Sequence, residues 1–213
     1  MSQKFSLREA ERKAFTISFD DGLWDIFLGC FFLEFVIAPF LSERLGDFWS
    51  SVIFLPFWGL VYLAIWLIRK YVVKPRIGLV KYGPARTAKL KKFTLLILLI
   101  NIVVFILGVI ALFSFGVFST QIYPIILGLT LLVGFCVAAY FLDFPRLYIY
   151  GLLLACSPLV GEWLYTYRNA SHHGWPITFG ITCSIMILTG LIIFIRFLRN
   201  NPIPMMETSV EGR

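Results

Sequence analysis

Charged residues and histidines are scarce in this sequence. Only 15% of its 213 residues are Asp, Glu, Lys or Arg, and only two are histidine. Soluble domains carry about 25% charged residues and about 45 to 50% apolar residues. Because 59% of this chain is hydrophobic, a soluble fold is excluded. The composition predicts an all-α integral membrane protein, located in the cell membrane with several passes.

Motifs for metal, cofactor and catalytic sites are also missing. The sequence has no CxxC pair, no histidine at metal-ligand spacing from a cysteine and no phosphate-binding GxxxxGK[ST] loop. We therefore expect no metal, no cofactor and no catalytic residue, and catalysis is disfavoured. The cysteines lie in apolar runs and are expected to be buried small hydrophobes rather than disulfides: Cys30, Cys136, Cys156 and Cys183.

Six apolar runs are each long enough to cross a bilayer, which takes about 20 helical residues. They cover about 22–40, 49–68, 93–115, 122–142, 147–166 and 175–195. We predict a bundle of six transmembrane helices over 22–198, flanked by an amino-terminal segment, 1–21, and a tail, 199–213. The first run carries Asp25 and Glu34 and lacks a cleavage pattern, so it is expected to remain as the first span.

Local signals add detail to this bundle. A capping box at Ser6 and Glu9 predicts a short interfacial helix from Ser6 to Phe15. The short turn at 143–146 predicts that the fourth and fifth helices are adjacent and antiparallel. Gly134 and Ala138, four residues apart in the fourth span, favour a close approach between helices.

Lysine and arginine counts predict the orientation. With the amino terminus inside, 17 of the 19 Lys and Arg residues lie on the inner side, and only Arg44 and Arg168 lie outside. Cytoplasmic segments of membrane proteins carry this excess. We therefore expect both termini to be cytoplasmic. The net charge of +7 is explained by topology and by anionic lipid headgroups, so nucleic acid is not an expected partner.

Nine of the basic residues lie in the loop 69–92, which contains no acidic residue. Its glycines, prolines and β-formers suggest a small hairpin followed by a basic helical turn. Arg76, Lys81 and Arg86 are candidate ligands for a phosphate or a lipid headgroup, because arginine binds phosphate oxygens through two donors. The alternative interpretation is that these charges act only as a topology signal.

Ionisable groups within the apolar runs have the strongest functional implication, because their burial in lipid is costly. Asp25 is expected to pair with Arg146 or with the basic loop. Glu34 and Glu162 are predicted to lie at similar depth in the outer half of the bilayer. Proline breaks in the second and fifth spans fall at the same depth and free backbone carbonyls there.

A polar, outer-facing cavity is therefore the leading functional hypothesis. Its candidate substrate- or ion-binding residues are Glu34, Glu162, Ser157, Pro158 and Asn101. We expect transport or permeation of a proton, a cation or a small cationic substrate. If the two glutamates meet, like charge and desolvation would favour protonation of one of them. The alternative is a structural role, in which each glutamate is protonated or hydrogen-bonded to a neighbouring helix.

Two other functions remain open at this stage. One is a non-transporting accessory or scaffold subunit that binds a cytoplasmic partner or anionic lipid through its basic loop. Its partners would be the lipid bilayer, another membrane protein or a second copy of the chain. The other is an intramembrane lipid-modifying enzyme that uses Ser157 near Glu162, a pair without a histidine base.

Overall fold

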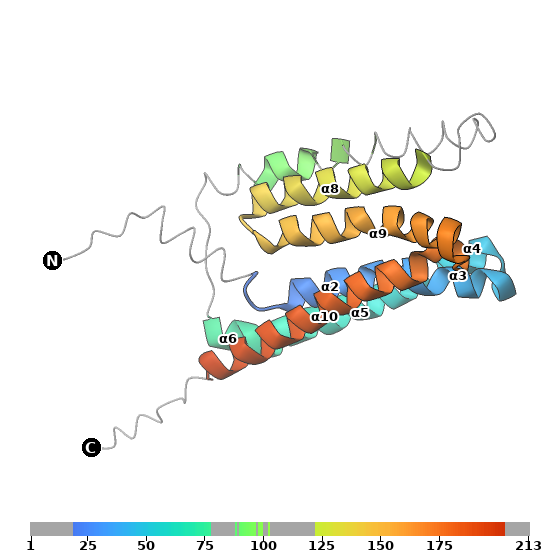
Figure 1. Cartoon of the computed structure of the whole chain (residues 1–213). Helices are drawn as coiled ribbons and strands as arrows, with labels where there is room; N and C mark the ends of the chain where they lie inside the picture. Colours follow the sequence, from blue (N-terminus) through green and yellow to red (C-terminus); the bar gives the residue numbers. More distant parts are fainter. Residues whose placement is uncertain are drawn as a thin grey trace, which may run out of the picture.

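The computed structural model describes residues 19–77, 88, 90–96, 98–99, 102 and 122–202. Within these residues all the regular elements are helices (Figure 1). They are α2 (Leu23–Phe32), α3 (Glu34–Leu45), α4 (Asp47–Val52), α5 (Phe54–Ile68), the π-helix η1 (Arg69–Val73), α6 (Lys74–Ile77), α8 (Ile122–Leu142), α9 (Arg146–Arg168), the 3-10 helix η2 (His172–Gly174) and α10 (Trp175–Asn200).

Five helical stretches are long and apolar enough to span a membrane: Leu23–Leu45, Phe48–Arg76, Ile122–Leu142, Arg146–Arg168 and His172–Asn200. They correspond to the first, second, fourth, fifth and sixth predicted spans, so the all-helical class is confirmed, and their length and composition are those of membrane-spanning helices. Most of the third predicted span, 93–115, lies outside the described residues, as do the Ser6–Phe15 helix and the end of the tail, 203–213.

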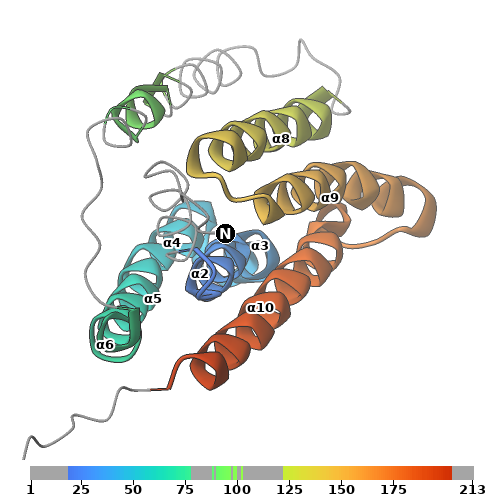
Figure 2. The same ribbon diagram turned by 90° about the vertical axis from the view of Figure 1, so that its left-hand side faces the viewer.

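The helices pack around α2 and its continuation α3. α2 and its continuation α3 lie against α10, and α2 also contacts α5 (Figure 2). α9 packs on α10, and α8 packs on α9 as its antiparallel neighbour. The turn between α8 and α9 places Asp143 at a positive φ of 51° and lets Phe144 N–H donate to Ala139 C=O at 3.1 Å. The predicted adjacency of the fourth and fifth helices is therefore confirmed.

Local signals explain the boundaries of α9 and α10. Pro145 precedes α9, and Asn169 ends it in the left-handed conformation that asparagine tolerates. α10 begins after Gly174, which has a φ of 64°, and carries Pro176 in its first turn, where a missing N–H costs nothing.

The basic segment differs from its prediction. Residues Arg69–Ile77 continue α5 as a π-helical turn and a short α-helix, so the expected hairpin is wrong for this part. The reason is that these residues extend a long apolar helix, and local β-forming side chains do not outweigh that continuity. The rest of the loop, 78–87 with Lys81 and Arg86, lies outside the described residues.

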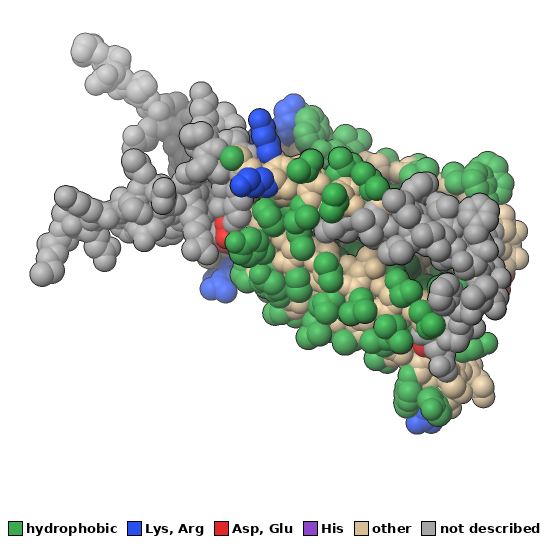
Figure 3. All heavy atoms as spheres, turned by 90° about the horizontal axis from the view of Figure 1, so that it is seen from above, with side chains coloured by type: hydrophobic (Ala, Val, Ile, Leu, Met, Phe, Trp, Pro, Cys, Tyr) green, Lys and Arg blue, Asp and Glu red, His purple; other side chains and the backbone are tan. Residues whose placement is uncertain are grey.

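We refer to the end of the bundle with Arg69, Arg146 and Arg199 as the basic end. α2 begins there, α8 ends and α10 ends. In Figure 3 most of the visible Lys and Arg side chains gather there, while hydrophobic side chains cover much of the visible surface beyond it. The sides of the helices are rich in exposed large apolar residues, such as Leu60, Leu129 and Ile192. Such a surface suits contact with lipid.

Buried residues form two clusters. The larger centres on side chains with no exposed surface, among them Leu154 of α9 and Phe179 of α10, and Phe35 of α3 stacks on Phe179 at 4.8 Å between ring centroids. The smaller one joins Leu23, Val73 and Phe197 at the basic end. Together the two clusters hold α2 and α3 against α10 and the end of α5.

Glycine allows close helix contacts. A Cβ atom added at Gly128 would lie 2.7 Å from Ala155 O, and one added at Gly22 would lie 2.3 Å from Gly190 O. At Gly134 the same test meets no atom of the described residues within 4 Å, so α8 packs on α9 through a different face. The expected close approach at Gly134 stays a prediction.

The four cysteines are free, as predicted. Cys183 is buried, whereas Cys156 is exposed on α9, so the expected burial is wrong for Cys156. An apolar run does not by itself tell which face of a membrane helix meets lipid.

Candidate functional site

Glu34 lies at a break in the first span. The regular α-helical hydrogen bonding breaks at Leu33, between α2 and α3, where the backbone angles remain helical, and Glu34 is the first residue of α3. One turn later Pro39 has no N–H to donate to the carbonyl of Phe35. Further along, the Ser42 hydroxyl donates to Pro39 C=O at 2.8 Å. The break therefore places a carboxyl group beside backbone that is not fully bonded within the helix.

A cavity of about 270 Å³ opens next to this carboxyl. Its lining residues come from α3, α4 and the start of α10: Glu34, Phe35, Ala38, Pro39, Ser42, Ser50 and Trp175. Ser50 is nearly fully buried, at 2% exposure. Trp175 Nε1–H is buried without a hydrogen-bond partner among the described residues. We call this the Glu34 cavity; it combines a carboxyl, two hydroxyls and an indole donor.

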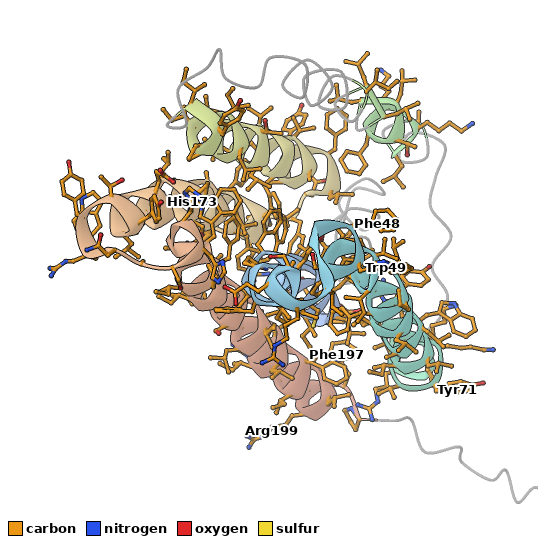
Figure 4. All side chains as sticks on the ribbon, turned by 90° about the vertical axis from the view of Figure 1, so that its right-hand side faces the viewer. Phe48, Trp49, Tyr71, His173, Phe197 and Arg199 are labelled. Atoms are coloured by element: carbon orange, nitrogen blue, oxygen red, sulfur yellow. The ribbon has the colours of Figure 1, made fainter. Side chains whose placement is uncertain are left out.

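Glu162 makes a different contact. Its Oε2 lies 3.0 Å from His173 Nδ1, in the loop that joins α9 to α10. Figure 4 looks at the bundle from this end and shows His173 where α9 meets α10. A second pair joins His172 Nε2 to Glu43 Oε1 at 3.2 Å. Among the residues that line the Glu34 cavity, Glu162 does not occur.

The two histidines share a strained backbone. Both have positive φ values, 50° at His172 and 53° at His173, where non-glycine residues are uncommon. The loop then ends at Gly174, whose backbone lies against Gly161 of α9. The two imidazole–carboxylate pairs thus attach the α9–α10 loop to α3 and to α9.

Ser157 and Pro158 belong to the buried side of α9, and Ser157 contacts α10. The Ser157 hydroxyl donates to Leu153 C=O at 2.9 Å and lies 3.0 Å from Thr182 Oγ1 of α10. Pro158 is fully buried. These contacts differ from those of Glu162, although the residues are close in sequence. The hydroxyl pair is the interhelical kind of hydrogen bond that polar residues make in membranes.

The remaining predicted residues are placed only in part. Asn101, Lys81 and Arg86 lie outside the described residues. Arg76 Nη1 donates to Leu198 C=O at 3.4 Å, at the end of α10, and its Nε–H is buried without a partner in the described part of the chain. Arg76 is thus turned partly toward the protein itself.

A buried ionic cluster at the basic end was not anticipated as a site. Asp21 and Asp25 have no exposed surface. Asp21 accepts from Arg69 Nη2 at 2.7 Å and from Leu23 N–H at 3.0 Å. Burial raises the pKa of Asp21 above its usual value, although Arg69 opposes this shift.

Asp25 completes this cluster from one turn further along α2. The Tyr150 hydroxyl donates to Asp25 Oδ1 at 2.7 Å, and Arg146 Nη2 lies 3.5 Å from Oδ2. The expected pairing of Asp25 with Arg146 is therefore present. Asp25 Oδ2 has no hydrogen-bond partner among the described residues. The sequence did contain a signal for this cluster: two aspartates, Asp21 and Asp25, lie four residues apart at the start of an apolar run.

No family model, curated protein or solved structure matches the chain.

Proposed function

We propose that the protein transports or conducts a proton or a small cation across the bilayer and that Glu34 is its principal binding group. The observation that carries this proposal is the Glu34 cavity itself. It places an ionisable carboxyl, two hydroxyls and a donor without a protein partner at a break in a candidate span. A cation or a proton is the chemistry that a carboxyl surrounded by hydroxyls accepts.

Asp25 supplies a second carboxyl in the same candidate span as Glu34. It precedes Glu34 by nine residues, which corresponds to about 13 Å along a helix. An ionisable side chain inside a candidate span, buried and with one oxygen free of hydrogen bonds, is expensive to keep. Proteins keep such a group mainly where it has a function. A proton that binds transiently to Asp25 Oδ2 would remove the charge of this buried carboxylate.

Glu162 and His173 form the rim of this proposed route. Their contact at 3.0 Å joins the loop before α10 to α9, and Trp175, two residues after His173, lines the Glu34 cavity. In the proposed outward orientation, this end of the bundle faces the outside. Glu162 then contributes to attraction of the cation, and Glu34 binds it.

The test is flux into liposomes that contain the purified protein and a pH-sensitive dye, driven by a potassium diffusion potential. We expect proton uptake by the wild type and uptake near the level of empty liposomes for Glu34→Gln. Glu43→Gln is the matched control, because Glu43 lies on the same helix, is 67% exposed and does not line the cavity.

The same flux assay is repeated with Na⁺ and K⁺ gradients at constant pH to identify the ion. Glu162→Gln is expected to lower the rate less than Glu34→Gln, because Glu162 lies outside the cavity lining. Wild-type flux equal to that of empty liposomes for protons and for both cations would contradict the proposal. The accessory or scaffold function would then be the better explanation.

A further inference from the structure

A second, larger cavity lies between α2 and α8. Its volume is about 650 Å³, within the range of small-ligand sites, about 300 to 1,000 Å³. Aromatic side chains dominate its walls, including Trp24, Phe31, Phe93 and Phe135. Among the described residues that line it, the Thr130 hydroxyl and the Trp24 indole N–H are the only polar side-chain groups. We call it the α2–α8 cavity.

Small residues on α8 create this space. Gly134 and Ala138 both line the cavity, and a Cβ atom added at Gly134 would meet no atom of the described residues within 4 Å. Less than two turns earlier the same helix packs closely on α9, where a Cβ atom added at Gly128 would lie 2.7 Å from Ala155 O. The space is therefore local.

The shape of the cavity indicates a linear molecule. Along α8 it extends from Thr130 to Leu142, twelve residues or about 18 Å. A slot of that length accommodates one extended hydrocarbon chain. Both α2 and α8 belong to candidate spans, so the surrounding medium supplies such chains.

Cations gather where the cavity reaches the basic end. The Arg146 guanidinium lies 4.8 Å from the centroid of the Phe144 ring, which is part of the cavity wall. Its hydrogen bond to Phe19 C=O and its contacts with the Asp20 and Asp25 carboxylates all use Nη2. In the described part of the chain, Nη1 and Nε of Arg146 have no protein partner, and this side chain is 22% exposed.

Two lysines extend this basic rim. Lys91 and Lys92 are exposed and directly precede Phe93, whose ring lines the cavity and lies 5.8 Å from that of Phe141. Guanidinium and ammonium groups at the end of an apolar slot match a molecule with a hydrocarbon chain and an anionic phosphate. Three carboxylates compete with a phosphate at this rim. Asp20 and Asp25 each lie 3.5 Å from Arg146, and Asp143 directly follows Leu142 of the cavity wall.

We propose that the α2–α8 cavity binds one acyl chain of an anionic phospholipid, with its phosphate held by Arg146 and by Lys91 and Lys92. The chain replaces empty space against Phe135 and Leu131, and the phosphate accepts from the donors of Arg146 that face no protein acceptor. This lipid site is separate from the Glu34 cavity and does not depend on the transport proposal.

The test is native mass spectrometry of the protein released from detergent with equal amounts of phosphatidylglycerol and phosphatidylcholine. We expect one phosphatidylglycerol to remain bound to the wild type in preference to phosphatidylcholine. Gly134→Phe should lose this lipid, because its ring fills the cavity. Gly59→Phe is the matched control, since Gly59 also has open space around it but lies on α5, outside the cavity.

A second variant tests the headgroup without touching the cavity. Lys91→Glu/Lys92→Glu reverses two exposed charges and should abolish the preference for phosphatidylglycerol while one lipid of either kind still binds. Equal retention of phosphatidylglycerol by Gly134→Phe and Gly59→Phe would overturn the proposal. So would equal binding of the two lipids to the wild type, or an unchanged preference in the lysine variant.

Discussion

The contact between Gly22 and Gly190 offers a sharp test of how α2 is held on α10. Gly22 has a φ of 74° at the start of α2, and a Cβ atom there would lie 2.3 Å from Gly190 O and 2.9 Å from Phe194 N. Both neighbours are backbone atoms, so they cannot move aside as a flexible side chain could. Gly22→Ala therefore introduces two separate penalties.

The two penalties can be estimated separately. A left-handed conformation costs a non-glycine residue about 1–2 kcal/mol. Overpacking of a close contact costs about 1–3 kcal/mol more. We therefore expect Gly22→Ala to lower the free energy of unfolding by about 2–5 kcal/mol. This contact lies beside the Asp21–Arg69 pair, so the loss should also loosen the basic end.

Two control glycines separate the contributions. Gly46 has a φ of 79° and a ψ of 161° with nothing within 4 Å of its Cβ position, so Gly46→Ala should show the backbone penalty alone, about 1–3 kcal/mol. Gly59 is helical and equally open, so Gly59→Ala should be neutral or stabilise by up to about 1 kcal/mol.

The assay is SDS-induced unfolding in mixed micelles, followed by tryptophan fluorescence and by far-ultraviolet circular dichroism. The expected order of stability is Gly59→Ala above Gly46→Ala above Gly22→Ala. If Gly22→Ala unfolds at the same SDS fraction as Gly59→Ala, neither the left-handed turn nor the contact with Gly190 holds α2 in place, and the reasoning fails.

Two further predictions concern buried polar contacts. Burial raises the pKa of Asp21, so the stability that Asp21 contributes is present at low pH and is lost as pH rises through this raised pKa. The stability advantage of the wild type over Asp21→Asn in SDS titrations should therefore shrink as pH rises from about 4. An advantage that grows with pH would show that Arg69 affects the pKa of Asp21 more than burial does. Ser157→Ala and Thr182→Val should each cost about 1 kcal/mol, with the double variant less costly than the sum, whereas strict additivity would mean that the hydroxyls do not interact.

Some candidate-site residues follow from sequence patterns, but their partners do not. The polar environment of Glu34 was expected from a carboxyl at membrane depth, and the Asp25–Arg146 contact from charge pairing. The Glu162–His173 contact was not expected, because adjacent histidines on a loop show no orientation in sequence. The Tyr150–Asp25 hydrogen bond joins residues 125 positions apart, and only the packing of both α2 and α9 on α10 brings them together.

The amino-acid sequence by itself determined the helical class of the described chain and where along it the apolar helices lie. The predicted fourth run, 122–142, coincides with α8, because a continuous apolar stretch of that length buries its backbone polar groups only as a helix. Tertiary structure alone decided which faces meet. Apolar side chains surround these helices almost evenly, so periodicity cannot distinguish a lipid-facing side from a packed one. For that reason the cavity beside Gly134 and the ionic cluster around Asp21 emerge only when the helices are assembled.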